Sequence, residues 1–201
     1  MGILGRLLRR NHHDPYWKRF ITGPLADPVN EIGPALRSAH EGAVFPTQSP
    51  LPAPSRLTSD LGELAQFLGA TSLGVLSTDA SRRGSQLASD DQEGHSTVTD
   101  YPFTIICTVP AEYDPRESPG IGGQHSLREA ASISFSLAAY IRELGYRATV
   151  QPRDSDRLAA EAGLGEIGRN GRLVSPEHGT KVYVGDVVLT DVPLAAGVVR
   201  G

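Results

Sequence analysis

The spacing of hydrophobic positions predicts two helices in the chain. In the stronger of the two, apolar and small residues recur every three or four positions and form one stripe. A capping box at Ser126 precedes this stripe and Gly145 follows it, so we expect a helix over Leu127–Leu144. A similar box at Asp60 predicts a helix over Leu61–Leu68. The stripe of the stronger helix consists of Leu127, Ala130, Ala131, Ser134, Leu137, Ala138, Ile141 and Leu144.

Four shorter runs of apolar and β-branched residues predict strands. Between the last two runs, Asp154 or Ser155 can cap a further helix that continues through Ala162. Strands and helices interleave without a steady strand–helix–strand repeat, so we expect a mixed α+β fold rather than a purely parallel sheet. The predicted strands are Ser72–Ser77, Phe103–Val109, Tyr146–Gln151 and Lys181–Thr190, of which the last is expected to be the final strand.

The first part of the chain lacks such periodicity. Residues 1–57 are rich in proline, glycine and histidine, with only a short helix predicted near Pro28–Ala39. We expect an extended N-terminal arm that lies over its own domain, over a second copy or over a partner in a larger complex, with Trp17 and Phe20 as anchors. The expected division is therefore an arm (1–57), a domain (58–194) and a C-terminal tail (195–201).

Composition narrows the classes of function. The net charge of −4 disfavours nucleic-acid binding as the main role. The single cysteine, Cys107, excludes a disulfide framework and any iron–sulfur cluster or zinc site held by cysteines of this chain. No apolar run approaches the roughly 20 residues that span a bilayer, and Arg9-Arg10 is not followed by the apolar region of an export signal. We therefore expect a cytoplasmic protein with no transmembrane segment.

The strongest chemical signal is a glycine-rich segment, Gly163–Gly179, which holds five glycines. Its first three glycines match the dinucleotide-binding fingerprint letter for letter. That fingerprint requires a strand before it and a helix after it. Here a helix is predicted before the segment, and Asn170-Gly171 would break a helix after it. Two interpretations remain: a structural loop with tight turns, or exposed backbone laid against a large flat or anionic ligand.

Four motifs in the second half of the chain have the order and spacing of a known superfamily. They are Tyr140–Tyr146, Glu161–Gly171, Ser175–Gly179 and Val188–Leu194. With them the chain resembles the cobalamin-dependent reductive dehalogenase and epoxyqueuosine reductase superfamily, and its dehalogenase branch more than its queuosine branch. This resemblance implies a nitroreductase-like α/β/α sandwich that binds cobalamin in its base-off form. The residues that it implies for cofactor binding are Gly163, Leu164, Gly165, Gly168, Asn170, Gly171, Ser175, His178 and Gly179.

The resemblance identifies only part of an active site in this sequence. In the dehalogenase branch a tyrosine above the cobalt, helped by a basic residue, is the expected proton donor. Tyr113 is our candidate, together with Arg169 and Arg172, because a nearby cation lowers the pKa of a tyrosine. Alternatively, Tyr113 lies in a surface turn and the two arginines are solvated or paired with Glu166 and Glu177. The other candidate tyrosines are Tyr101, Tyr140 and Tyr146.

The chain departs from the superfamily in its electron supply. Reductases of this kind carry a ferredoxin-like region after the final strand, with cysteines that hold two iron–sulfur clusters, whereas this sequence has only Cys107. The resemblance therefore implies a cobalamin-binding reductase domain or subunit that takes electrons from a separate iron–sulfur ferredoxin-type partner. Two alternatives stay open: a non-catalytic carrier or structural subunit of a larger complex, and a flavin-dependent reductase on a nitroreductase-like fold.

Overall fold

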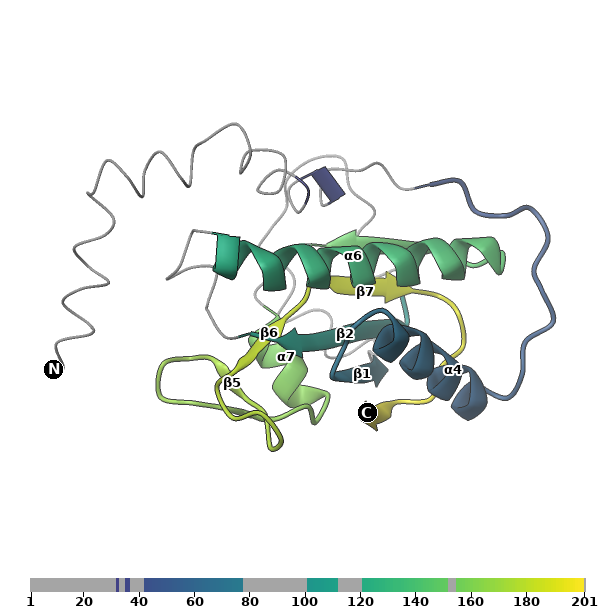
Figure 1. Ribbon diagram of the computed structural model, residues 1–201. Helices are drawn as coiled ribbons and strands as arrows, with labels where there is room; N and C mark the ends of the chain where they lie inside the picture. The colour runs from purple at the N-terminus through teal and green to yellow at the C-terminus, as the bar shows by residue number, and fades with distance from the viewer. Residues whose placement is uncertain are drawn as a thin grey trace, which may run out of the picture.

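The computed structural model describes residues 32, 35–36, 42–77, 101–111, 121–151 and 155–200. Within those ranges, no helix is both long and apolar enough to cross a bilayer. The helices labelled in Figure 1 are α4 (Pro54–Phe67), α6 (Ile121–Glu143) and α7 (Asp156–Glu161). The strands are β1 (Ser72–Ser77), β2 (Phe103–Pro110), β3 (Ala148–Gln151), β4 (Glu166–Ile167), β5 (Leu173–Val174), β6 (Val182–Val184), β7 (Val187–Thr190) and β8 (Gly197–Arg200).

Six of these strands form one sheet. Its order is β3-β7-β2-β1-β8, and β6 pairs with β2 on the same edge as β7. Strands β4 and β5 form a separate hairpin. All of these strand pairs are antiparallel. The predicted mixed α+β class is confirmed, while the finer description as a nitroreductase-like sandwich stays a prediction.

Helices cover both faces of this sheet (Figure 1). On one face α4 and α6 enclose the larger core, in which Leu61 and Ile133 are completely buried. On the other face α7 and the β4–β5 hairpin enclose a smaller core that includes Leu173. Side chains alternate along β2, so that Ile105 belongs to the first core and Ile106 to the second. The glycine-rich segment thus lies on the face of the sheet opposite to the long helices.

Both long helices begin earlier than their capping boxes predict. α4 begins at Pro54, because the fixed φ of proline and its missing N–H suit the first turn of a helix. Asp60 therefore lies within α4, where it forms an ion pair of 2.8 Å one turn back along the same helix. α6 begins at Ile121, and the hydroxyl of Ser126 donates to the carbonyl of Pro110 at 3.2 Å instead of capping the helix. A capping box marks a favourable helix start without excluding an earlier one, and in α4 the preceding residues Leu57 and Thr58 are buried.

The predicted strand Lys181–Thr190 is in fact two strands, β6 and β7. Thr108 pairs with Val184 and Ile105 pairs with Val188. The two residues of β2 between these pairs therefore face three residues, 185–187, of the segment that joins β6 to β7. This extra residue forms a bulge at Gly185–Asp186, where the ladder to β2 is interrupted. The sequence carried a signal for this bulge, because Gly185-Asp186 interrupts the run of apolar residues and a glycine inside a strand is typical of a bulge.

The prediction that this strand is the last one is wrong as well. β8 follows it, pairs with β1 and lies within the predicted tail. A Cβ added at Gly62 of α4 would stand 2.5 Å from Cγ1 of Val199, so α4 packs closely over this strand. β3 also begins two residues later than predicted, at Ala148. The C-terminal residues described by the structure are therefore part of the sheet.

The described part of the predicted arm packs on its own domain. The N–H groups of Phe45 and Ser49 donate to carbonyls at the end of α6, each at 2.9 Å. Gly145, with φ of +85°, leaves space for this crossing, since a Cβ there would stand 2.7 Å from the backbone of Gln48. Residues 1–31, with Trp17 and Phe20, lie outside the described residues, as does most of the helix predicted near Pro28–Ala39.

Candidate functional site

The glycine-rich segment Gly163–Gly179 folds into two successive turns beyond α7. The first turn belongs to the β4–β5 hairpin and is closed by a 2.8 Å bond from the N–H of Gly168 to the carbonyl of Arg172. The second turn joins Ser175 and Gly179 through two backbone bonds of 2.8 Å. Because helix α7 precedes the segment and strand β4 follows its first glycines, the arrangement of a dinucleotide-binding fingerprint is not formed.

A buried carboxylate ties the hairpin to the start of α7. Asp156 is 6% exposed, and its Oδ1 accepts a hydrogen bond from the N–H of Leu173 at 2.8 Å. Its Oδ2 lies 3.9 Å from Nη1 of Arg172. One carboxylate therefore holds both β5 and the arginine that precedes this strand. Sequence reasoning missed Asp156, although an acidic residue in the first turn of a helix is a recognisable signal.

The two arginines proposed as catalytic occupy different environments. The side chain of Arg172 is only 20% exposed and faces Asp156. Burial lowers the pKa of Arg172, while an electrostatic interaction with Tyr183 acts in the opposite direction. Arg169 is exposed on the turn of the hairpin. Arg172 is thus held by its own domain, whereas Arg169 faces solvent.

Four glycines of the segment form two pairs, which differ in whether a Cβ atom added at the glycine would meet other atoms. A Cβ at Gly165 would overlap the carbonyl oxygen of Val174, and one at Gly168 would stand 3.0 Å from the side chain of the same valine. These two glycines permit close packing inside the hairpin. Gly171 and Gly179 have φ values of +76° and +57°, and no described atom lies within 4 Å of a Cβ at either position. Their backbone is therefore bare and faces open space.

Most hydrogen-bonding groups that the resemblance assigns to a ligand are bonded within the chain. Oγ of Ser175 accepts the N–H groups of Glu177 and His178, at 3.3 and 3.4 Å, and Oδ1 of Asn170 accepts the N–H of Arg172 at 3.2 Å. The side chains of Asn170 and His178 are nevertheless exposed, as is that of Arg169. Backbone N–H groups that donate to nearby carbonyls are those of Gly163, Leu164, Gly168, Gly171 and Gly179.

The proposed proton donor, Tyr113, lies outside the described residues, so its role stays a prediction. Among the alternative tyrosines, Tyr101 is buried, and its ring centroid lies 5.2 Å from Cζ of Arg147. Tyr140 is exposed on α6, on the face opposite to the glycine-rich segment, and Tyr146 packs against the larger core. Sequence reasoning did not consider Tyr183, which is the tyrosine that interacts with Arg172.

The bulge at Gly185–Asp186 is held from both faces of the sheet. Oγ of Ser134, on α6, donates to the carbonyl of Asp186 at 2.9 Å, and Oγ of Ser155 donates to the carbonyl of Gly185 at 2.7 Å. Ser155 occupies the N-cap position of α7 but makes no cap bond with its side chain. Its hydroxyl therefore fixes the start of α7 to the sheet, next to Asp156.

The motif Val188–Leu194 has a structural role in this chain. The hydroxyl of Thr190 donates to the carbonyl of Arg147 at 2.8 Å and accepts the N–H of Val192 at 3.0 Å. The carboxylate of Asp191 accepts both the N–H and the Nε–H of Arg147, at 2.8 and 2.7 Å. These contacts join the end of β7 to the start of β3, so the motif marks a fold rather than a reactive group.

The described residues contain no metal-binding cluster. No group of three or more His, Cys, Asp or Glu side chains among them is positioned to hold a metal ion. Cys107 lies in the larger core, and burial raises its pKa to about 12. Its thiol therefore keeps its proton at neutral pH and is not available as a thiolate ligand.

Comparison with curated proteins found similar enzymes of one kind. The chain is 31% identical over 99 residues to the tetrachloroethene reductive dehalogenases of Desulfitobacterium hafniense and of Dehalobacter restrictus (strain DSM 9455 / PER-K23). The match covers 45% of this chain and 18% of each relative, so the chain spans less than a fifth of these proteins. No family model matches the chain.

Solved structures show the same relationship. The catabolic reductive dehalogenase NpRdhA superposes with a TM-score of 0.65 and 25% identity, over 87% of this chain and 25% of that one. A second reductive dehalogenase, whose structure is described as suggesting a mechanism for B12-dependent dehalogenation, has the same fold, with a TM-score of 0.63 and 24% identity. The described domain thus corresponds to about a quarter of each of these longer chains.

Proposed function

We propose that this chain, which is similar in sequence and fold to reductive dehalogenases, is a corrinoid-binding reductase domain or subunit. Sequence identity, fold and the four sequence motifs all support this proposal. The description of one neighbour in terms of B12-dependent dehalogenation supports cobalamin as the corrinoid. The superfamily resemblance implies the base-off form.

The observation that carries the proposal is the bare backbone at Gly171 and Gly179. Both positions are left-handed, and the space that a side chain would fill is open at each. A corrin is a large flat ring with amide side chains, so it can approach a turn closely only where no Cβ intervenes. The exposed side chains of Arg169, Asn170 and His178 lie in the same segment. They fit such a ligand, because they supply donors for its amides and for the phosphate of its nucleotide tail.

The remaining residues of the segment would position these groups. Asp156 fixes β5 and Arg172, and the close packing at Gly165 and Gly168 fixes the hairpin that presents Gly171. A bound corrinoid would supply the low-potential centre at which a substrate is reduced. Tyr113 remains the proposed proton donor, with Arg169 as the exposed cation in the segment.

We also propose that electrons reach this domain from iron–sulfur clusters held elsewhere. Its one cysteine is buried and protonated, whereas a cluster takes four ligands that are usually thiolates. The clusters would belong to a ferredoxin-type partner or to further residues of a longer chain. We expect turnover only with such a partner or with a strong artificial reductant. Turnover by the purified chain with NADPH alone would instead favour the flavin alternative.

Titration of the full chain with hydroxocobalamin tests the ligand. We expect a change in the corrinoid absorption spectrum and a rise in Tm that follows the ligand concentration. Gly171→Asn and Gly179→Asn should weaken binding at least tenfold with little change in Tm, because asparagine tolerates left-handed backbone while its side chain occupies the open space.

Gly197→Ala is the matched control for these variants. Gly197 also has a positive φ and open space around it, but it lies on β8, outside the glycine-rich segment. We expect this variant to bind hydroxocobalamin as the unaltered chain does. A chain that shows neither a spectral change nor a rise in Tm would refute corrinoid binding. Equal weakening by all three variants would refute the assignment of the site.

A further inference from the structure

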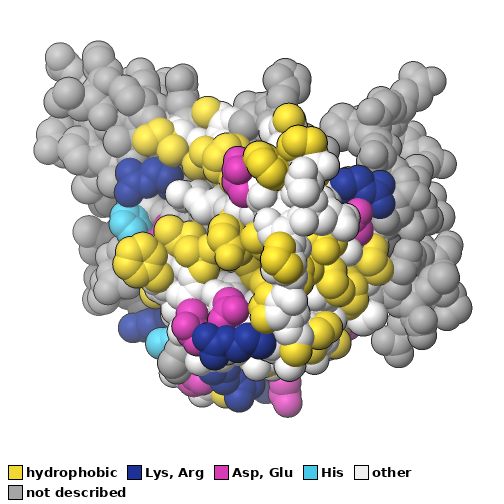
Figure 2. All heavy atoms as spheres, turned by 90° about the vertical axis from the view of Figure 1, so that its right-hand side faces the viewer, with side chains coloured by type: hydrophobic (Ala, Val, Ile, Leu, Met, Phe, Trp, Pro, Cys, Tyr) yellow, Lys and Arg dark blue, Asp and Glu magenta, His cyan; other side chains and the backbone are white. Residues whose placement is uncertain are grey.

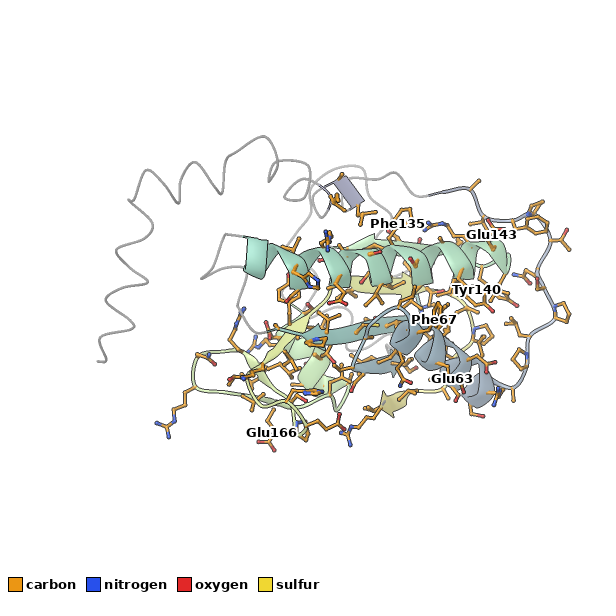
Figure 3. All side chains as sticks on the ribbon, in the orientation of Figure 1. Glu63, Phe67, Phe135, Tyr140, Glu143 and Glu166 are labelled. Atoms are coloured by element: carbon orange, nitrogen blue, oxygen red, sulfur yellow. The ribbon has the colours of Figure 1, made fainter. Side chains whose placement is uncertain are left out.

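A second surface of the molecule, opposite to the glycine-rich segment, exposes aromatic side chains. Phe67 is 86% exposed at the end of α4, and Tyr140 is 42% exposed on α6. Glu63 and Glu143 are exposed on the same two helices, which form one layer on the sheet (Figure 3). We call these four residues the α4–α6 surface. Figure 2, which shows the end of the molecule where α6 finishes, has hydrophobic side chains spread over it with both acidic and basic ones among them.

Two features set this surface apart from an ordinary solvated helix face. Phe67 leaves most of its surface in solvent although burial of a phenylalanine side chain is favourable, and Tyr140 on the neighbouring helix is exposed as well. Two large aromatic side chains exposed on neighbouring helices indicate a surface that another segment covers.

The charge of the surface restricts what can cover it. Glu63 and Glu143 form no ion pair with any described residue. A covering segment should therefore combine cations with aromatic or aliphatic side chains. Residues 1–20 have this composition, with five arginines and lysines against one aspartate, and they include Trp17 and Phe20.

The path of the chain brings that segment to the same place. Residues 42–53 cross the end of α6, where the N–H of Phe45 donates to the carbonyl of Arg142. Gly42 lies beside the side chain of Arg142, one residue before Glu143. About 20 residues separate residue 20 from Gly42, and at roughly 3.3 Å per residue they can reach any point along α6, whose 23 residues span about 35 Å.

We propose that residues 1–20 of this chain dock on the α4–α6 surface of the same molecule. The aromatic side chains of the segment cover Phe67 and Tyr140, and its cations pair with Glu63 and Glu143. The α4–α6 surface and the glycine-rich segment lie on opposite faces of the sheet, so docking leaves the proposed corrinoid site open.

The sequence offers a clean cross-linking test, because its only lysines are Lys18 and Lys181. Carbodiimide treatment of the monomeric full chain should join Lys18 to Glu63 or Glu143, as identified by mass spectrometry of the peptides. Lys18→Arg should remove the cross-link and keep the charge. Cross-links of Lys18 that map only to other acidic residues, or only between two chains, would overturn the proposal.

Trp17 is the only tryptophan and provides a second measurement. We expect its side chain to be shielded from the quencher acrylamide. This shielding should not depend on protein concentration and should decrease at high salt, which screens the ion pairs. Phe67→Ser and Glu63→Lys should raise the quenching constant at least twofold, whereas the matched controls Ile167→Ser and Glu166→Lys, on exposed residues of β4, should not.

Three outcomes of the fluorescence experiment would overturn the proposal. Trp17 that is fully accessible in the unaltered chain would show that the segment is not docked. Shielding that rises with concentration together with the mass from light scattering would assign the surface to a second copy. A larger effect of the β4 variants than of the α4 variants would place the segment on the other face. Corrinoid titration of Phe67→Ser, which should match that of the unaltered chain, keeps this test separate from the proposed function.

Discussion

The carboxylate of Asp156 and the N–H of Leu173 are joined by a buried hydrogen bond of 2.8 Å. Asp156 opens α7 and Leu173 opens β5, so this bond links the two elements that border the glycine-rich hairpin. The same carboxylate lies 3.9 Å from the guanidinium of Arg172. The orientation of the proposed binding segment therefore depends on an acidic residue that would not contact the ligand.

Removal of this carboxylate should loosen the hairpin. Asp156→Ala leaves the buried N–H of Leu173 without an acceptor, and loss of a hydrogen bond to a charged group costs about 1.5–3 kcal/mol. Asp156→Asn should cost less, since an amide oxygen can still accept. Urea unfolding would measure the stability loss of each variant. We also expect faster hydrogen exchange over residues 166–174. The control is Asp60→Asn, whose exposed ion pair on α4 is worth about 0.5 kcal/mol or less. Equal costs for Asp156→Ala and Asp60→Asn would contradict this role.

Substitutions at the glycines should separate folding from binding. Gly165→Ala brings a methyl group into the carbonyl oxygen of Val174, and overpacking of this kind costs typically about 1–3 kcal/mol. Gly171→Asn should leave the free energy of unfolding nearly unchanged, because asparagine tolerates the left-handed backbone and the space at that position is open. Thermal unfolding of the two variants decides between these expectations. If Gly165→Ala were as stable as Gly171→Asn, the glycine would not be packed against β5.

The two serines at the bulge should contribute to stability as a pair. Ser134→Ala and Ser155→Ala each remove the hydroxyl from a buried carbonyl, with an expected loss of about 1–3 kcal/mol each. The double variant should lose less than the sum, because the two carbonyls belong to adjacent residues of one bulge. Ser132→Ala, on an exposed position of α6, is the matched control and should be neutral. Strict additivity in urea unfolding would mean that the bulge does not couple the two helices.

Burial of Cys107 predicts a pH dependence of stability. The pKa of its thiol is about 12 in the folded chain, against an ordinary value of 9.0. Between these values the folded state holds a proton that the unfolded state has lost, so this contribution is complete below pH 9 and is lost as the pH rises toward 12. The free energy of unfolding should therefore decrease less between neutral and alkaline pH for Cys107→Ala than for the unaltered chain.

The same burial should make the thiol unreactive in the native protein. A thiol reagent at about pH 8 should modify Cys107 only at the rate at which the domain opens, because the thiolate is the nucleophile that attacks the reagent. Addition of urea beyond the unfolding midpoint should expose one thiol for each chain. Rapid modification without denaturant would show that β2 is not enclosed by the two cores.

Local patterns were sufficient for several elements. β1 has the bounds that its apolar run predicts, and the stripe of α6 packs on the sheet as its spacing indicates. The helix start at Pro54 and the early start of α6 were missed, because a capping box marks a favourable start without excluding an earlier one. The two hydroxyls that hold the bulge at Gly185–Asp186 come from positions about 30 and 50 residues away, so no local pattern reveals them.

Local patterns and motifs were also enough to predict the mixed α+β class, the position of the glycine-rich segment and the similarity to reductive dehalogenases. They could not distinguish one glycine of that segment from another. Gly165 and Gly171 are the same residue type, yet one abuts the backbone of β5 and the other has open space around it. The difference lies in the atoms that surround each Cα, and folding alone brings those atoms into place. Asp156 became significant for the same reason, since a carboxylate acts through the partners that the folded chain places beside it.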